Sequence, residues 1–214
     1  MKFDLIKKTI EINKMIKSQN LGVISSGNAS IKISDDLIAI KPSGIDFDLI
    51  NEKNISLVDL NGRLKKGFKP SSDLDIHLRL FNHFKDLKCV IHTHSHFASV
   101  FAILNKDLEV LSTFHADFFG KKIECLPFIN HRTQNIGDFI IKKTKKLPAI
   151  FLVGNHGIFV LSNDPDDCIK KAIALEEIAK LNYHSLLLNK KVKKIKDTEI
   201  EKMNYYYKTK YGQK

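Results

Sequence analysis

The sequence predicts an α/β domain in which much of the sheet is antiparallel. Apolar residues recur at helical spacing near both ends of the chain, and short strand-like segments bounded by turn residues lie between them. The dipeptide Asn61-Gly62 is typical of a tight hairpin turn, which joins antiparallel strands. The 214 residues contain no repeat, low-complexity block or linker, so we expect one domain over residues 1–214.

The helices can be predicted in chain order. The N-terminal segment MKFDLIKKTIEINKMI places apolar side chains among charges at near-helical spacing, and it lacks the apolar core and cleavage site of a signal peptide. A second helix is expected after Ser71-Ser72, with a serine as its cap. A third should run from Asp166 to Leu188 after Pro165. One face of this third helix would carry Cys168, Ala172, Leu175, Ile178 and Leu181.

The strands are predicted from short β-branched or aromatic segments that end at turn residues. The segment Val90–Val100 is expected to begin as a strand and continue as a helix. The other expected strands are Ser30–Ile33, Leu37–Lys41, Ser56–Asp59, Ile123–Pro127 and Ala149–Leu152.

The net charge of +11 raises the question of a nucleic-acid partner. The lysines are scattered as pairs, with one denser stretch at Lys190–Lys196, and the sequence has neither a basic helix interleaved with aromatic residues nor a zinc-finger spacing. We therefore expect a solvated basic surface, no nucleic-acid partner and a weak preference for an anionic small substrate. The longest apolar run, Pro148–Gly154, is far short of the roughly 20 residues that span a bilayer, so no membrane segment is expected.

Three cysteines, Cys89, Cys125 and Cys168, are widely spaced and odd in number. This pattern indicates reduced, buried thiols better than a disulfide framework. Together with the absence of a signal peptide pattern, it predicts a cytoplasmic protein.

The segment VIHTHSH at residues 90–96 is the strongest indication of chemistry. On a strand, His92 and His94 would lie on the same face, roughly 6.6 Å apart along the chain, so both imidazoles could bind one metal. His156 lies between Gly154 and Gly157, which let the backbone pass close to a ligand. Three histidines with an open position are typical of a catalytic metal site. Asp73 offers a fourth, oxygen ligand.

Three polar loops form a second candidate site: Gly27-Asn28-Ala29-Ser30, Lys41-Pro42-Ser43-Gly44 and Pro70-Ser71-Ser72. Each offers hydroxyl, amide, lysine or backbone N–H groups, which bind phosphate at nests and helix N-termini. Taken singly, each loop is more often a plain turn. Beside a metal cluster, the three together predict a phosphosugar site.

In chain order these motifs resemble the class II aldolase/adducin family. The motifs are GNAS, KPSG, SSD followed by a histidine, HTHSH, HADFFG, NHG, ALEEIA and a terminal YGQ, and they cover about residue 5 to residue 213. The last of them resemble in particular the L-ribulose-5-phosphate 4-epimerase branch. The resemblance implies an α/β/α domain around a largely antiparallel sheet. It also implies a homotetramer, in which active sites lie between neighbouring subunits.

The resemblance further implies a site for one divalent metal, commonly zinc, on His92, His94 and His156, with Asp73 beside them. The substrate phosphate would be held by Asn28, Lys41, Ser43, Gly44, Ser71 and Ser72. In this family the metal acts as a Lewis acid on a ketose phosphate and stabilises the enediolate formed when a C–C bond breaks.

Two residues indicate which reaction follows. An aldolase releases the aldehyde, whereas the epimerase retains it, rotates it and rejoins the bond, which interconverts L-ribulose 5-phosphate and D-xylulose 5-phosphate. Asp117 resembles the acid/base carboxylate of the epimerases, and Tyr211 resembles their C-terminal tyrosine, which acts on the other face. Aldolases tend to lack that carboxylate and to place a tyrosine where this chain has Thr113. These features favour the epimerase.

Two alternatives remain open. The acidic insertion of the epimerases after the strand near Cys125 is missing, as in aldolases that cleave a ketose phosphate such as L-fuculose 1-phosphate. An adducin-like scaffold without catalysis should lack the metal histidines, and this chain has all three. Among the remaining histidines, His77 and His96 are interpreted as orienting Asp73 or a ligand. His83, His131 and His184 are expected at the surface, and His115 either lines the site or is structural.

Overall fold

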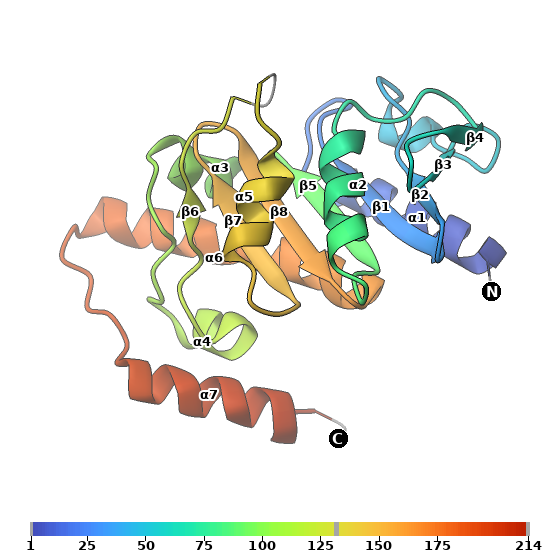
Figure 1. The fold of residues 1–214 in the computed structure, drawn as a ribbon. Coiled ribbons are helices and arrows are strands. Elements are labelled where there is room, and N and C mark those ends of the chain that lie inside the picture. The colour runs from blue at the N-terminus through green and yellow to red at the C-terminus, as the bar shows by residue number, and fades with distance from the viewer. Residues whose placement is uncertain (1, 131–132, 213–214) are drawn as a thin grey trace.

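One eight-stranded sheet organises the chain. The computed structural model describes residues 2–130 and 133–212, shown in Figure 1. The strand order is β4-β3-β2-β1-β5-β8-β7-β6, and every neighbouring pair is antiparallel except β6 and β7. The strands are β1 (Asn28–Ser34), β2 (Leu37–Ile40), β3 (Ser56–Asp59), β4 (Leu64–Lys66), β5 (Cys89–Thr93), β6 (Cys125–Leu126), β7 (Ala149–Val153) and β8 (Gly157–Ser162).

Helices cover both faces of this sheet. They are α1 (Lys2–Ser18), α2 (Leu74–His83), α3 (His96–Ile103), α4 (Thr113–Phe119), α5 (Ile136–Lys143), α6 (Pro165–Leu188) and α7 (Asp197–Lys210), with a short 3-10 helix η1 (Phe47–Leu49). One core layer packs α1, α3 and α6 against the sheet, and the other packs α2 and α5 against the opposite face. The predicted α/β/α architecture with a largely antiparallel sheet is therefore confirmed.

The alternating faces of the strands explain the two layers. In β5, Cys89 and Ile91 belong to the layer with α6, whereas Val90 between them belongs to the layer with α2. Both faces are covered, so these strands read as continuous apolar runs. The predicted hairpin joins β3 to β4, and Gly62 adopts φ 84°, a conformation that glycine accepts readily.

Several details differ from the sequence prediction. The N-cap of α2 is Asp73, with no side-chain capping hydrogen bond, so the predicted serine cap is wrong. Leu181 is 50% exposed instead of lying on the buried face of α6. Strand β8 and helices α4 and α7 were not predicted. All three cysteines are free, and Cys125 is only partly buried. No helix in residues 2–130 or 133–212 has the length and apolarity to cross a membrane.

Candidate active site

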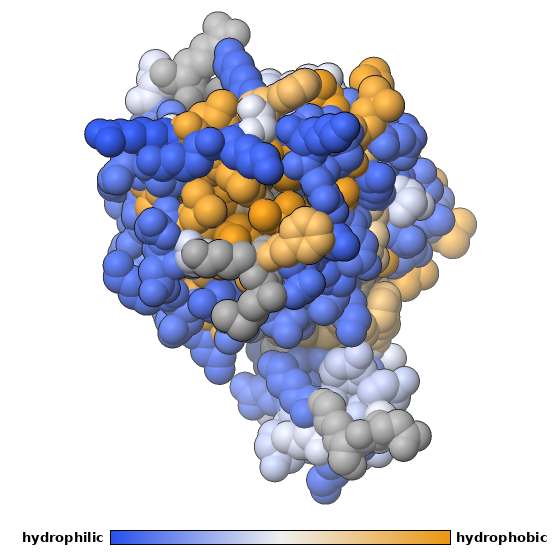
Figure 2. All heavy atoms as spheres, turned by 90° about the vertical axis from the view of Figure 1, so that its right-hand side faces the viewer, coloured by the Kyte–Doolittle hydropathy of each residue, from blue (hydrophilic) through white to orange (hydrophobic). Residues whose placement is uncertain are grey.

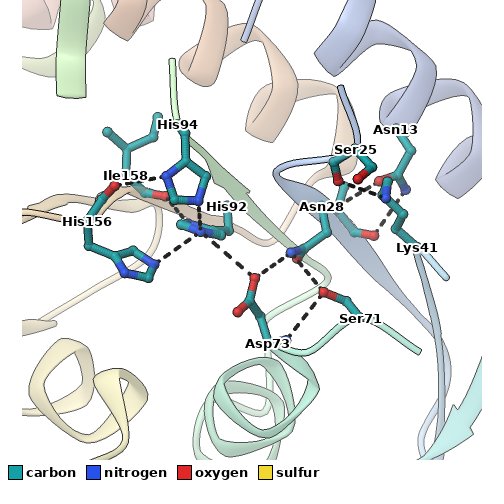
Figure 3. A network of polar contacts seen from close by, with 11 residues as sticks. Asn13, Ser25, Asn28, Lys41, Ser71, Asp73, His92, His94, His156 and Ile158 are labelled. Carbon is teal, nitrogen blue, oxygen red and sulfur yellow. Dashed lines mark hydrogen bonds and ion pairs between the residues drawn. The ribbon is translucent and has the colours of Figure 1, made fainter. Parts of the chain in front are cut away.

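Three imidazoles converge where β5 ends beside the turn between β7 and β8 (Figure 3). His92 is on β5, His94 follows that strand, and His156 lies in the turn. The Nε2 atom of His92 is 3.1 Å from that of His94 and 3.2 Å from that of His156. One ligand nitrogen from each ring lies within 4.8 Å of the other two. His92 and His94 thus lie together as predicted, although His94 follows the strand, and His156 joins them from the turn.

The hydrogen bonds of these rings fix where their lone pairs point. His92 Nδ1 lies 2.8 Å from the carbonyl oxygen of Ile158, and His94 Nδ1 lies 2.9 Å from that of His156. A carbonyl oxygen only accepts, so each Nδ1 carries the proton and each Nε2 presents a lone pair. Two lone pairs facing each other at 3.1 Å repel unless a cation lies between them. The donor set therefore fits a metal ion, with the backbone orienting its ligands.

Burial keeps the central imidazole in the form that binds a metal. His92 is 1% exposed, and burial lowers its pKa to about 3 against the opposing effect of Asp73. It is therefore neutral at neutral pH, as a metal ligand must be.

Asp73 faces this cluster from the N-cap position of α2. Its Oδ2 accepts a 2.7 Å hydrogen bond from Asn28 Nδ2 and lies 3.9 Å from His92 Nε2. Burial raises the pKa of Asp73, but His92, His77 and the Asn28 amide outweigh burial and hold the pKa below its usual value. The carboxylate is thus ionised and directed toward the histidines, which explains why it does not cap its own helix.

The candidate phosphate loops meet beside Asp73. A β-bridge joins Pro42 to Pro70, so the segments on either side run next to each other. Ser71 Oγ accepts a hydrogen bond of 3.1 Å from Asn28 Nδ2, and the Ser71 N–H donates to the carbonyl of Lys41 at 3.0 Å. The predicted residues Ser43, Gly44 and Ser72 are exposed at the rim of these loops. All three loops therefore reach one side of the histidine cluster, as Figure 3 shows for Asn28, Lys41 and Ser71.

Lys41 is the cation of these loops, and it is 2% exposed. Its Nζ donates to the carbonyl oxygen of Ser25 at 3.0 Å and lies 4.9 Å from the centre of the Phe47 ring. Burial lowers its pKa, with Asp46 and Asp73 opposing. Asn28 Oδ1 is also buried, and no partner for it exists among the described residues. The ammonium group of Lys41 suits an anionic ligand, and the buried Oδ1 of Asn28 can accept a hydrogen bond from a polar one.

The roles of two supporting residues were not predicted from the sequence. Asn13 of α1 bonds both the N–H and the C=O of Ala29, at 2.8 and 3.1 Å, which fixes the backbone next to Asn28. Glu176 of α6 accepts from the N–H groups of Phe97 and Ala98 at 2.8 and 2.9 Å, which holds the start of α3 just after His94. Asn13 is a buried polar residue on the mostly apolar face of α1, where Thr9 is buried one turn before it, and this pattern could have identified it.

Asp117 and Tyr211 lie apart from the metal cluster. Asp117 is partly buried on α4, where burial raises its pKa, and Tyr211 ends α7 with its ring stacked on Tyr207 at 4.9 Å. Asn204 of α7 donates to the carbonyl of Asp117 at 2.7 Å, which ties the two helices together. Figure 1 shows α4 and α7 at the lower edge of the molecule, whereas α2 begins near the upper edge.

The other histidines have separate roles. His77 is buried and hydrogen-bonded to Ser30 Oγ at 2.6 Å, and it acts on Asp73 by lowering the pKa of that carboxyl group. His96 is exposed and packs its ring edge-on against Phe97. His115 is buried and bonded to the Lys121 carbonyl, which is a structural position. His83 and His184 are exposed as predicted, and His131 lies outside the described residues.

Three converging imidazoles that could hold a metal ion, with a facing carboxylate and adjoining polar loops, are typical of a metal-dependent enzyme site for a small polar substrate. The fold is consistent with this class. The chain belongs to the class II aldolase family, since the family model "Class II Aldolase and Adducin N-terminal domain" matches residues 7–183. This match includes the histidines and all the polar loops, and it ends before α7.

Relatives of known name carry two different reactions. A probable L-ribulose-5-phosphate 4-epimerase, UlaF, of Mycoplasma pneumoniae is 30% identical, with 98% of this chain and 92% of the relative covered. An L-fuculose phosphate aldolase of Methanococcus vannielii is 33% identical, with 83% and 95% covered. A solved L-fuculose 1-phosphate aldolase superposes with a TM-score of 0.85 at 26% identity, covering 96% of both chains. The chain is therefore an enzyme of the class II aldolase superfamily, with the predicted family confirmed.

Proposed function

We propose that this protein is an L-ribulose-5-phosphate 4-epimerase that interconverts L-ribulose 5-phosphate and D-xylulose 5-phosphate. The observation that carries the choice is Asp117, a partly buried carboxyl group with a raised pKa on a helix that is tied to the one bearing Tyr211. Epimerisation needs a proton carrier on each face of the retained aldehyde, and these two groups supply the pair. The relative named as an epimerase aligns over nearly the full length of the chain.

The metal site would hold one divalent cation, which we propose is zinc. His92, His94 and His156 would bind it, with Asp73 beside them. When bound, the cation would supply Lewis acidity toward the ketose oxygens. The backbone carbonyls of Ile158 and His156 keep the imidazoles turned toward this position.

The substrate phosphate would be bound by the loops next to Asp73. Lys41 supplies the positive charge, and Ser71 supplies a hydroxyl group within reach of Asn28. The exposed residues Ser43, Gly44 and Ser72 offer further hydroxyl and N–H donors at the rim. This arrangement would orient the sugar so that its ketose end reaches the histidines.

Asp117 and Tyr211 would act on the metal site of a neighbouring subunit. Both belong to the α4–α7 pair at the far end of the molecule from the histidines, so a site formed by one chain alone would lack them (Figure 1). The raised pKa of Asp117 favours its role as a proton carrier. An oligomer in which α4 and α7 reach the next subunit would complete each site.

An aldolase that cleaves a ketose 1-phosphate is the second candidate. The relatives named L-fuculose phosphate aldolase support it, as does the short segment between β6 and α5. In that reaction Asp117 would have no proton to carry.

Parallel assays separate the two candidates. The purified enzyme should convert L-ribulose 5-phosphate to D-xylulose 5-phosphate faster than it cleaves L-fuculose 1-phosphate. Asp117→Asn should lower epimerisation about 10²–10⁴-fold and retain its metal, because the amide cannot take up a proton. Epimerisation at the wild-type rate by this variant would refute the proposed role, and faster aldol cleavage by the wild type would identify an aldolase.

A further inference from the structure

A second pocket lies at the opposite end of β7 from the metal site. It encloses about 770 Å³ between α4, α7 and the beginning of β7, where Ala149 and Phe151 form part of its wall. His156 follows the other end of this strand. The lining of the pocket contains none of the three histidines, and Ala149 lies roughly 13 Å from Val153 along β7 at 3.3 Å per residue, so the pocket and the histidines are separate sites.

Lysines from several elements converge on this pocket. They are Lys121 after α4, Lys143 at the end of α5, Lys145 and Lys146 before β7, Lys171 on α6 and Lys208 on α7. Among the described residues, the lining contains two carboxylates, Asp167 and Glu124. Asp167 pairs with Lys171 at 2.5 Å, and Glu124 lies 3.7 Å from Lys143. Within the described residues, Lys121, Lys145 and Lys146 form no ion pair, so a strong positive charge is left over.

These ammonium groups lie close enough to affect one another. Burial lowers the pKa of Lys208, and repulsion by Lys146 and Lys171 lowers it further, against the opposing effect of Asp167. Folding thus gathers like charges at some cost, which a bound anion would relieve. A hollow lined by one sign of charge also concentrates ions of the opposite sign.

The walls between the lysines are apolar and aromatic. Phe118 and Tyr207 line the pocket with ring centres 5.2 Å apart, and Phe151 and Pro148 add further apolar surface. Such walls accommodate the organic part of a ligand, and the volume lies within the range of small-molecule sites. The lysines surround a hollow instead of following a helix face, which favours a small molecule over a nucleic acid.

We propose that this pocket binds a small phosphorylated molecule that carries at least two phosphate groups. Two or more phosphates match the number of converging lysines, because ammonium groups bind phosphate as point charges. The pocket adjoins the α4–α7 pair that carries Asp117 and Tyr211, but binding of a ligand in it does not depend on the proposed epimerase reaction. Its position beneath α7 means that a bound ligand would link Lys208 of that helix to Lys146 and Lys171 of the main body.

Calorimetric titration of the full-length, metal-loaded protein with pyrophosphate and with ADP tests this proposal. The variant Lys145→Gln/Lys146→Gln/Lys208→Gln removes three charges from the pocket. The control variant Lys190→Gln/Lys191→Gln/Lys193→Gln removes three exposed charges elsewhere. Metal content, thermal melting and oligomeric state are compared before titration, since pyrophosphate can also extract metal. A Lys41→Met background removes binding at the proposed phosphate loops.

We expect the pocket variant to weaken pyrophosphate binding at least tenfold and the control to stay within twofold of the wild type. Tighter binding of ADP than of pyrophosphate would show that the aromatic walls receive a nucleotide base, and equal binding would indicate recognition of the phosphates alone. Equal weakening in both variants would reveal general charge attraction and overturn the proposal. Unchanged binding in the pocket variant, or tighter binding of a single-stranded oligonucleotide than of either probe, would also overturn it. The proposal would also be overturned if the wild type bound no pyrophosphate and the pocket variant changed its oligomeric state.

Discussion

Gly157 shows how one residue determines the geometry of the histidine cluster. A Cβ atom added there would lie 2.5 Å from the Thr93 carbonyl oxygen and 3.2 Å from His94 Nδ1. The first distance is a clash with backbone, so β5 and β8 would have to separate at the point where His92 and His94 are held. The glycine is therefore required for close approach and not for an unusual φ.

Gly157→Ala should lower metal affinity about 10–100-fold, the usual effect of disturbing groups that orient metal ligands. Metal content after dialysis against a buffered zinc solution measures this effect. Ile158→Val, a buried change in the same strand that adds no atom, is the control and should retain its metal. Full metal occupancy in the alanine variant would contradict the argument.

Lys41 tests the proposed phosphate loops at the level of one side chain. Lys41→Met keeps the buried aliphatic stem and removes the charge next to Ser25 and Pro42. Charge-assisted contacts contribute about 1.5–3 kcal/mol, so KM should rise about 10–150-fold with little change in kcat. Steady-state kinetics with L-ribulose 5-phosphate measure both constants. Lys53→Met, an exposed lysine, should leave them unchanged, and an unaltered KM for Lys41→Met would place the phosphate elsewhere.

Individual site residues could be predicted where their chemistry is visible in the sequence. Only one residue separates His92 on β5 from His94 just after that strand, so the alternation of a strand already predicts both side chains on one face. The roles of Asn13 and Glu176 could not be predicted, because their partners are backbone groups 16 and about 80 positions away that only the fold brings close. The serine cap was wrong for a related reason: Asp73 is nearer to the helix, and its carboxylate is engaged with Asn28.

At the scale of elements, α4 depends on a buried neutral histidine. His115 is fully buried, its Nε2 lies 3.0 Å from the Lys121 carbonyl oxygen, and burial lowers its pKa from 6.5 to about 4. Below pH 6.5 His115 becomes protonated in the unfolded chain, whereas in the folded chain it stays neutral until the pH approaches about 4. The free energy of unfolding therefore decreases as the pH falls through this window.

His115→Gln should weaken that pH dependence, because glutamine can donate the same hydrogen bond without titrating. Between pH 7 and pH 5 the wild type should lose about 2 kcal/mol more stability than the variant. Urea unfolding at pH 7, 6 and 5 measures the difference. His83→Gln, which changes an exposed histidine, should follow the wild type, and parallel pH profiles for all three proteins would refute the argument.

Elements with strong periodic patterns were predicted, and those stabilised by partners were not. The segment 166–188 repeats apolar residues over many turns and forms α6 almost as predicted. Helix α7 has few apolar positions, and Ile200 is its only buried residue among those described, where it contacts Val110 and Ala116. Strand β8 was not predicted because the two glycines around His156 suggested a loop. In the structure, Gly157 already pairs with Val153 in the sheet.

At the scale of the whole molecule, the chain separates binding groups from proposed acid/base groups. The exposed surface is uneven as well: Figure 2 shows an apolar hollow on the face that carries α1, and Ile10 and Ile50 line the cavity there. The α4–α7 pair projects at another end of the molecule, with Tyr205, Tyr206 and Tyr211 exposed on α7 and at its end. Folding of one chain therefore leaves exposed tyrosines, on the helix that packs against α4, available to a neighbour. The sequence alone could not predict this separation, because it depends on where two distant helices pack.

Mixing two inactive variants tests whether sites are shared between subunits. His92→Asn removes the central metal ligand, and Asp117→Asn removes the proposed proton carrier, so each variant alone should be almost inactive. If α4 and α7 complete the site of a neighbour, some interfaces in a mixed oligomer combine an intact histidine cluster with an intact Asp117. Random mixing in a ring would restore about a quarter of the wild-type sites. Epimerase activity is measured after the chains are unfolded, mixed and refolded together, with hybrid formation confirmed by native mass spectrometry and each variant refolded alone as the control. If confirmed hybrids stay as inactive as the separate variants, one chain supplies both the histidine cluster and Asp117 to each site. Only a site formed within one chain gains nothing from its neighbour.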